Sequence, residues 1–399
     1  MDARGHGRVG PGRRRGPSTA PLAALVALAV VLGACSGLPR GLLVQRPGSS
    51  STASAGSIDA FVPEAVRFVQ DHRGLTFKKS VKVRHLADKA FADRVIQLQR
   101  KDHADLDRQA RVLRALGLLR PDVDPEKAEE ELLGSGVVGF YDPETKELEV
   151  RGTTATVSVK HVVVHELTHA LQDQWFTLPT GGSSGNDDAD LAYTTLVEGD
   201  AVRVETAYVM GLSARDRQAL QQEESGQGGT PPDVPQVLVE LLEFPYVVGP
   251  RFTQAVLQAR GQQGLDAAFR NHPAASSQVL HPDRFLGGET PATPPEPPAD
   301  GTVFDRGTLG EMGVDLLLED LVRSGALTGA QLQAAATGWA GDRYVAWSQG
   351  SGYCVRDRLA ARTPADAAAL LTALAKLAAA HPTITADATA AQPVLTSCG

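Results

Sequence analysis

The sequence predicts an α+β protein that is mostly helical and contains a small mixed β-sheet. Apolar residues recur at helical spacing in several long segments, the first of which begins at Ile58. Two short runs of strand-forming residues, 137–141 and 148–150, flank a polar turn over 142–146. The 399 residues, 42% hydrophobic and 22% charged, are ordinary for a globular protein and sufficient for one large domain or two modest ones.

The N-terminus has the pattern of an export signal. Five arginines precede an apolar run from Pro21 to Gly33, which is too short to span a bilayer comfortably as a helix. The run ends in Leu32-Gly33-Ala34-Cys35, which resembles the lipobox of bacterial lipoprotein precursors. The resemblance implies cleavage before Cys35, lipidation of its thiol, and anchoring by lipid on the extracytoplasmic face of a bacterial cell membrane. A plain secretory signal cut nearby is the alternative.

This interpretation divides the chain into three parts. Residues 1–34 form a signal peptide, residues 35–57 a flexible tether rich in Gly, Ser and Ala, and residues 58–399 the folded body. Removing residues 1–34 takes away five arginines and one aspartate, so the formal net charge falls from −8 to −12. Such an acidic body argues against a nucleic-acid partner and leaves membrane attachment to the lipid. Cys354 and Cys398 then either pair with each other or remain free thiols.

Helical patterns dominate the body. Residues 87–117 are expected to form one long helix or two, and residues 191–210 another. The C-terminal part, about 236–399, is expected to be helical, with a break at Phe244-Pro245-Tyr246 and a short strand over 341–347. Its helices are expected over 236–242, 251–259, 305–321 and 360–380.

The segment 162–174 contains the pattern H-E-x-x-H. On a helix, His165 and His169 lie one turn apart on the same face, so both imidazoles can bind one metal ion. Glu166 can reach a water on the open coordination position, as in zinc hydrolases. Apolar flanks predict a buried helix, whose polar groups need partners. An ordinary helix with satisfied histidines is the alternative, and His161, one turn earlier, is expected to be structural.

A second helix, over 191–210, offers a third ligand. Glu198 lies on a mostly apolar face, where a carboxylate requires a cation or a metal. It follows His169 by 29 positions, which is enough chain for the two helices to pack antiparallel. The alternative is a surface glutamate beside Gly199, which weakens the helix.

With these residues, the chain resembles the gluzincins, the thermolysin-like branch of zinc metallopeptidases, over about residues 136–210. The resemblance implies a zincin-like body with H-E-x-x-H on its active-site helix. It also implies one Zn²⁺ per chain, bound by His165, His169 and Glu198, with Glu166 as general base and a peptide or protein as substrate.

The sequence departs from the gluzincin pattern at the residue that would orient the first histidine. Val202 stands where that pattern has an acidic residue, four positions after Glu198. Asp173 or Glu205 is expected to take this role instead. No motif identifies the group that would stabilise the transition-state oxyanion. The candidates are His281, Arg343 and Tyr344.

Two functions are therefore compared. The first is a membrane-anchored zinc metallopeptidase; the second is a catalytically silent gluzincin-like binding or scaffold lipoprotein. The intact Glu166 favours the first, because a purely structural metal site needs no base and is usually closed by four protein ligands. The G-x-S-x-G match at 181–185 lacks a preceding strand and is expected to be a loop. The hairpin over 137–150 either pairs its edge strand with an extended peptide or simply covers the core.

Overall fold

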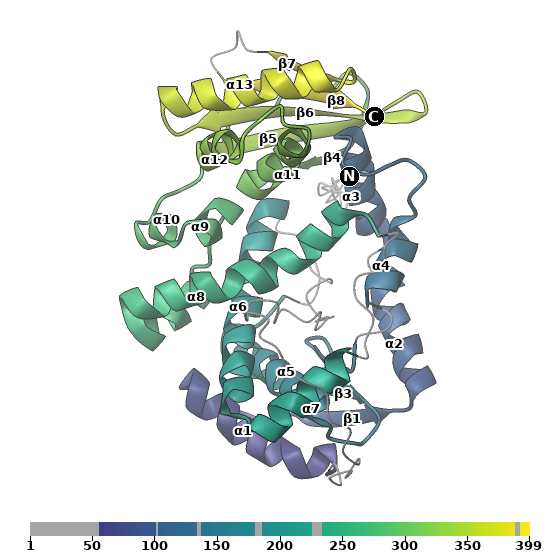
Figure 1. The fold of residues 1–399 in the computed structure, drawn as a ribbon, viewed down its shortest axis with the longest axis vertical. Helices are drawn as coiled ribbons and strands as arrows, with labels where there is room; N and C mark the ends of the chain where they lie inside the picture. The colour runs from purple at the N-terminus through teal and green to yellow at the C-terminus, as the bar shows by residue number, and fades with distance from the viewer. Residues whose placement is uncertain (1–55, 101–102, 134–136, 180–185, 226–233, 388–391) are drawn as a thin grey trace, which may run out of the picture.

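The computed structural model describes residues 56–100, 103–133, 137–179, 186–225, 234–387 and 392–399. The fold is α+β, with helices predominating and the strands in two small sheets, which confirms the predicted class (Figure 1). The signal peptide, Cys35, nearly all of the tether and the 181–185 motif lie outside the described residues.

The first sheet has three strands and is mixed. Its central strand β3 (Glu147–Arg151) runs parallel to β1 (Lys82–Leu86) and antiparallel to β2 (Gly139–Asp142). Helices α1 (Ile58–Arg73) and α5 (Val157–Phe176) pack together in one apolar core with residues of β3. The predicted hairpin is thus β2 and β3, and β2 is an edge strand.

Three helices run along one side of the molecule in Figure 1. They are α2 (Asp88–Arg100), α3 (His103–Ala115) and α4 (Pro125–Leu133). The pattern over 87–117, which allowed one helix or two, thus corresponds to two. Gly117 follows the second of them with a φ of +75°, a left-handed conformation in which glycine is least strained.

Two long helices cross in the middle of the molecule: α6 (Asp187–Gly211) and α8 (Gln236–Arg270), joined through α7 (Ala214–Ser225). Their backbones meet at Gly199 and Gly249, where a Cβ added to Gly199 would lie 2.2 Å from the Gly249 carbonyl carbon. The hydroxyl of Thr253 donates to the Gly199 carbonyl oxygen at 3.2 Å. Neither glycine therefore leaves room for a side chain at this crossing.

The expected break at 244–246 is wrong. Helix α8 continues through Pro245 and Pro250, and its backbone departs from helical geometry only at Gly261. Phe244, within the expected break, and Phe252, beyond it, are buried in one apolar cluster together with residues of α6. Packing on α6 thus outweighs the local cost of the two prolines.

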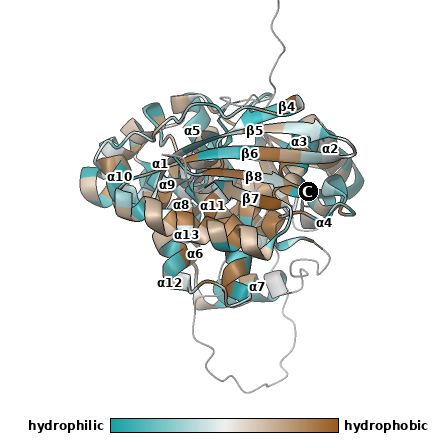
Figure 2. Cartoon of the chain, turned by 90° about the horizontal axis from the view of Figure 1, so that it is seen from above, coloured by the Kyte–Doolittle hydropathy of each residue, from teal (hydrophilic) through white to brown (hydrophobic). Residues whose placement is uncertain are grey.

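The expectation of a helical C-terminal part is incomplete, because it contains a second, five-stranded antiparallel sheet. Its order is β4-β5-β6-β8-β7. Helices of the same part pack against it, and α13 contacts β7 and β6 (Figure 2). The strands are β4 (Thr302–Gly307), β5 (Trp339–Gln349), β6 (Gly352–Ala361), β7 (Ile384–Asp387) and β8 (Val394–Cys398). The helices are α9 (Ser276–Leu280), α10 (Pro282–Leu286), α11 (Gly310–Arg323), α12 (Gly329–Thr337) and α13 (Pro364–Ala380).

Part of the segment predicted as a helix over 305–321 belongs to β4, and the strand predicted over 341–347 is longer as β5. Cys354 of β6 lies opposite Cys398 of β8, and a disulfide joins them. Of the two alternatives for these cysteines, the structure contains the pair. The bond ties the end of the chain to the centre of the second sheet.

The glycine contact at the crossing of α6 and α8 can be tested. We expect Gly199→Ala to lower the free energy of unfolding by about 1–3 kcal/mol, because the added methyl group forces two backbones apart. Gly211→Ala, at the end of the same helix with no atom within 4 Å of the added Cβ, is the matched control. It should be neutral or slightly stabilising. Equal urea midpoints for both variants would contradict the steric explanation.

Candidate metal centre

Helix α5 carries the H-E-x-x-H residues and is buried along most of its length. Thr156 caps its N-terminus, with its hydroxyl accepting from the Val159 N–H at 3.3 Å. His165, Glu166 and His169 are each at most 4% exposed. These polar side chains are withdrawn from water and must find partners inside the protein.

Helix α6 brings Glu198 to the two histidines. Glu198 Oε2 lies 3.2 Å from His165 Nε2 and 3.4 Å from His169 Nε2, and the two Nε2 atoms are 3.0 Å apart. Among the described residues, this is the group of three His, Cys, Asp or Glu side chains whose ligand atoms converge closely enough to hold one metal ion. The three ligands inferred from the sequence therefore meet at one point.

The outer nitrogen of each histidine is bound by an acceptor. Glu205 accepts from His165 Nδ1 at 2.9 Å and from His161 Nδ1 at 2.6 Å. The Nδ1 of His165 thus carries a proton, and its Nε2 faces the centre, where it can bind a metal ion after losing its own proton. His161, one turn before His165 on the same helix, has a different role. It binds Glu205 and is not one of the three residues that converge.

Gln172 fixes the second histidine in the same way. Its amide nitrogen donates to the Val197 carbonyl and to Asp200 Oδ2, both at 3.1 Å. Its amide oxygen therefore faces His169 Nδ1, at 3.0 Å, and makes that nitrogen the donor. Asp200 is held in turn by the fully buried Arg73, whose Nε lies 2.6 Å from Asp200 Oδ2. This network leaves the Nε2 lone pair of His169 pointing at the centre.

The centre consequently attracts positive charge. Burial lowers the pKa of His165, but hydrogen bonds to Glu198 and Glu205 outweigh it and hold the pKa well above its ordinary value. Burial raises the pKa of Glu198, but His169 and His165 outweigh it and lower the pKa to about 2. Hydrogen bonds from His161 and His165 likewise overcome burial at Glu205 and lower its pKa to about 2. Two carboxylates thus stay ionised around the histidines, where a metal ion can replace the bound protons.

The geometry fits zinc. Four ligands at about 2.0–2.1 Å in a tetrahedral arrangement lie about 3.3–3.4 Å from one another. The three separations of 3.0, 3.2 and 3.4 Å approach that spacing. Glu198 Oε1 is buried and has no hydrogen-bond partner among the described residues, as expected for a carboxylate that awaits a cation. Two neutral imidazoles and one carboxylate, with a fourth position open, are a donor set of catalytic zinc sites.

Glu166 is close to the centre but is oriented by the first sheet. Its Oε2 accepts from the Tyr141 N–H of edge strand β2 at 2.8 Å. Its Oε1 is buried and, within the described part of the chain, has no hydrogen-bond partner. Burial raises the pKa of this carboxyl to about 7. A carboxyl with such a pKa can both take up and release a proton near neutral pH.

Of the two proposed orienting residues, the structure brings Glu205 to the histidines. Asp173 instead accepts from the Tyr141 hydroxyl at 2.6 Å and from Lys146 Nζ at 2.7 Å. Glu205 follows Glu198 by seven positions, two helical turns, so it lies on the same face of α6 as the ligand. In the gluzincin pattern the orienting acid follows the glutamate ligand by four residues, a position that Val202 occupies here. In this chain the orienting acid follows Glu198 by seven residues instead.

The structure does not bring the three oxyanion candidates to the metal centre. His281 and Arg284 bind Glu311 of α11, and Tyr344 donates to Asp305 and to Asp187, at the start of α6. The exposed Arg343 lies beside Tyr344 on β5. His281 thus joins the α9–α10 segment to α11, and Tyr344 joins the second sheet to α6.

Tyr246 of α8 reaches the centre instead. Its ring stacks on His165 with centroids 6.4 Å apart and planes inclined by 27°, and its hydroxyl lies within the influence of the Glu198 carboxylate. Burial, together with the charges of Glu198 and Glu166, holds its pKa well above the ordinary value, so the phenol stays a donor. Sequence reasoning missed Tyr246 and treated it as part of a helix break. The available signal was an aromatic residue in a segment whose helical pattern continues on both sides of it.

The comparisons with known proteins concern another part of the chain. A family model described as a domain of unknown function (DUF8575) matches residues 301–395. The match covers most of the second sheet with its helices, less than half of the chain, and lies outside the metal centre. No curated protein and no solved structure matches the chain.

The role of Glu205 is testable through zinc affinity. Glu205→Gln places an amide donor against the Nδ1 of His161 or His165 and so disturbs the tautomer that the centre needs. We expect zinc to bind about 10–100-fold more weakly, measured by competition with a chromogenic chelator. Asp173→Asn, an equally conservative change at an acid that does not touch the histidines, should leave the affinity within about threefold. The same loss in both variants would remove the distinction.

Proposed function

We propose that this protein is a zinc metallopeptidase of the gluzincin type, with a zincin-like body built around α5 and α6. One observation carries the proposal: three acceptor atoms, His165 Nε2, His169 Nε2 and Glu198 Oε2, converge at 3.0–3.4 Å beside Glu166, whose Oε1 has no partner among the described residues. Three ligands and an adjacent base form the minimal set for metal-assisted hydrolysis.

The side chains divide the chemistry among them. Zinc, when bound, supplies Lewis acidity that polarises the scissile carbonyl and lowers the pKa of a water to about 7. Glu166 takes a proton from the attacking water and delivers it to the leaving amine, and the Tyr141 N–H holds this carboxyl in place. Tyr246 stays protonated beside Glu198, and its ring packs against the imidazole of His165.

Edge strand β2 offers a way to bind the substrate. Because β2 ends the sheet order β1-β3-β2, no strand of the described part of the chain pairs with its outer edge, and we propose that an extended peptide adds there. Tyr141 of β2 contacts Glu166, so a peptide in that position passes close to the base. The proposed substrate is therefore an extended peptide or an unfolded segment of a protein.

Mutation of the proposed ligand Glu198 and of the proposed base Glu166 should have different effects on zinc content and on activity. Glu166→Gln keeps the shape and the three ligands, so zinc should stay near one per chain while peptide hydrolysis falls about 10²–10⁴-fold or more. Glu198→Ala removes a ligand and should lose both zinc and activity. Metal content by mass spectrometry and digestion of a peptide library provide the two measurements.

Two results would change the proposal. If Glu198→Ala binds zinc as tightly as the parent, the third ligand is a different residue. If the parent binds zinc yet cleaves no peptide between about pH 5 and 9, the binding or scaffold lipoprotein becomes the better description.

We also propose that the protein is anchored to the outer face of the bacterial cell membrane by lipid on Cys35. The basic region, the short apolar run and the Leu32-Gly33-Ala34-Cys35 motif support this proposal. None of the helices in the described part of the chain is both long and apolar enough to span a bilayer.

Fractionation of cells tests the anchor. Cys35→Ser should release the protein from the membrane fraction or block its processing, because the lipid acceptor is lost. Ser36→Ala, next to it, should fractionate like the parent. Unchanged membrane association of Cys35→Ser would rule out the lipid anchor.

A further inference from the structure

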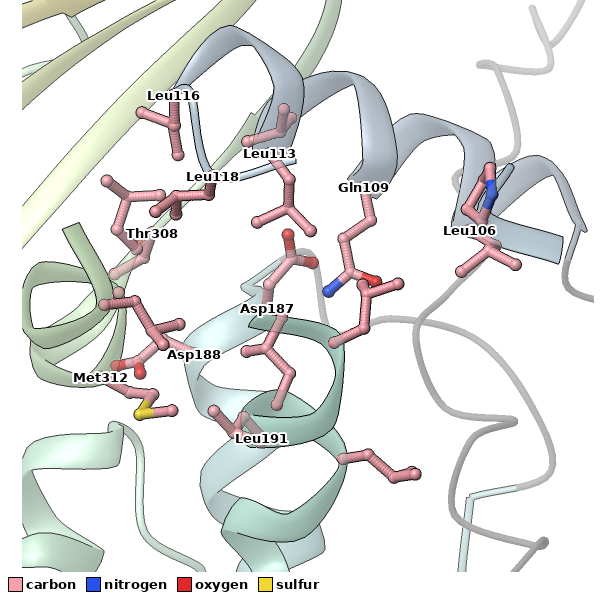
Figure 3. Close-up of a pocket in the computed structure, with 18 of the residues that line it drawn as sticks. Leu106, Gln109, Leu113, Leu116, Leu118, Asp187, Asp188, Leu191, Thr308 and Met312 are labelled. Atoms are coloured by element: carbon pink, nitrogen blue, oxygen red, sulfur yellow. The ribbon is translucent and has the colours of Figure 1, made fainter. Parts of the chain in front are cut away.

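A cavity lies between α3, α6, α8 and α11, away from the metal centre (Figure 3). It has a volume of about 160 Å³, and most of its wall is aliphatic. Helix α3 contributes Leu106 and Leu113, α8 contributes Leu238, and α11 contributes Met312 and Leu316. Apolar side chains from four helices thus surround a space that none of them fills.

The size of the cavity limits its occupant. An apolar cavity of about 150 Å³ binds a molecule such as benzene. A space of 160 Å³ therefore accepts one group the size of a leucine or phenylalanine side chain.

Two aspartates lie in this otherwise mostly apolar wall. Asp187 and Asp188, the first residues of α6, both line the cavity, and the carboxylate of Asp187 points toward Leu113 in Figure 3. Asp188 is 2% exposed, and its Oδ2 has no hydrogen-bond partner among the described residues. The only other charged residue of the wall is Glu129, so the described lining carries three acids and no base.

The surroundings do not neutralise these acids. Burial and Asp305 raise the pKa of Asp187 to about 6, against Arg108 and the Tyr344 hydroxyl, which lower it. Burial raises the pKa of Asp188 to about 7; hydrogen bonds from Ser276 lower it, and Asp342 and Glu311 add to the rise. The charged groups facing the pair are Arg108 on α3, Asp190 on α6, Asp305 on β4, Glu311 on α11 and Asp342 on β5. Acids outnumber the one base, so added positive charge is favoured.

We propose that this cavity binds an ammonium group attached to one leucine- or phenylalanine-sized apolar group. The ligand is either a small aliphatic or arylalkyl amine or the N-terminal residue of a peptide. The apolar group fills the space between the helices, and the ammonium binds the carboxylate of Asp187, with the charge of Asp188 on the same wall adding to the attraction. A carboxylic acid of the same shape is disfavoured, because it places a third negative charge beside two others.

This site is independent of the metal centre. Asp187 and Glu198 lie on one helix, eleven residues apart, which corresponds to about 16 Å along its axis. Ligand binding at the cavity can therefore be measured whether or not zinc is bound and whether or not the protein cleaves peptides. Failure of the proposed peptidase activity leaves this proposal standing, and the reverse also holds.

Three probes of one shape test the charge preference on the parent protein. They are 3-methylbutan-1-amine, 3-methylbutan-1-ol and 3-methylbutanoate, titrated calorimetrically at pH 8 with a chelator present. The amine should bind at least about tenfold more tightly than the alcohol, and the acid should bind least. Equal binding of amine and acid, or no binding of the amine at millimolar concentration, would overturn the proposal.

A pH series and two variants locate the effect. A pH of 5 lies below the pKa values of Asp187 and Asp188, about 6 and 7, so both carboxyls are then largely neutral. The amine should therefore bind at least about tenfold more weakly at pH 5 than at pH 8. Asp187→Asn should give a similar loss at pH 8, while Asp190→Asn, outside the cavity wall, should bind like the parent. Met312→Phe, which fills the cavity without changing its charge, should also reduce binding. Unaltered binding in both cavity variants would place the ligand elsewhere.

The two sources of the ligand are distinguished by peptides. Leu-Gly-Gly and its N-acetyl derivative differ only in the ammonium group. Binding of the free peptide and not of the acetylated one assigns the site to peptide N-termini. Binding of 3-methylbutan-1-amine without the peptide assigns it to small amines. Binding of the acetylated peptide as tightly as the free one would contradict an ammonium site.

Discussion

The metal centre depends on the close contact between α6 and α8. Gly199 and Gly249 let the two backbones approach until even one Cβ would overlap the other helix. Glu198 precedes the first glycine, and Tyr246 lies three residues before the second. The contact therefore fixes where α8 places Tyr246 relative to Glu198. The helix-weakening glycine next to this candidate ligand is a packing requirement, and the full burial of Glu198 removes the alternative of a surface glutamate.

Hydrogen bonds, in contrast, determine which atoms of the histidines face the centre. Glu205 and Gln172 each accept from one Nδ1, and Gln172 can do so because Val197 and Asp200 occupy its amide nitrogen. Two neutral imidazoles with Nε2 lone pairs 3.0 Å apart would repel each other, so the raised pKa of His165 keeps a proton at the centre when no metal ion is bound. A metal ion that displaces this proton and binds the folded state alone stabilises the fold.

The sequence predicted those parts of the site that follow from spacing along one element. His165 and His169 are one helical turn apart, so a helix alone brings them onto one face. Glu205 was one of two acids proposed to orient the first histidine, and the structure decides between them. Gln172 was missed although it lies three residues after His169 on the same helix, because the orientation of its amide depends on Val197 and Asp200 of α6. Tyr246 was missed because its role depends on the angle at which α5, α6 and α8 meet. The second sheet was missed for a related reason. Its strands are half-buried, and the sequence of one such strand does not indicate a strand until the neighbouring strands it pairs with are known.

Helix α6 shows how partners decide the charge of a buried carboxyl. Asp187 and Asp188 lie at its N-terminus, where the helix dipole favours anions, yet burial and nearby acids raise their pKa values. Glu198 lies in the middle of the helix with no such help, and its pKa falls to about 2 because two histidines face it. The position of a carboxyl on the helix therefore affects its pKa less than the groups that neighbouring elements place beside it. A carboxyl already faced by imidazoles can serve as a fixed ligand of a metal. A carboxyl surrounded by leucines and other acids stays dependent on a cation that a ligand brings.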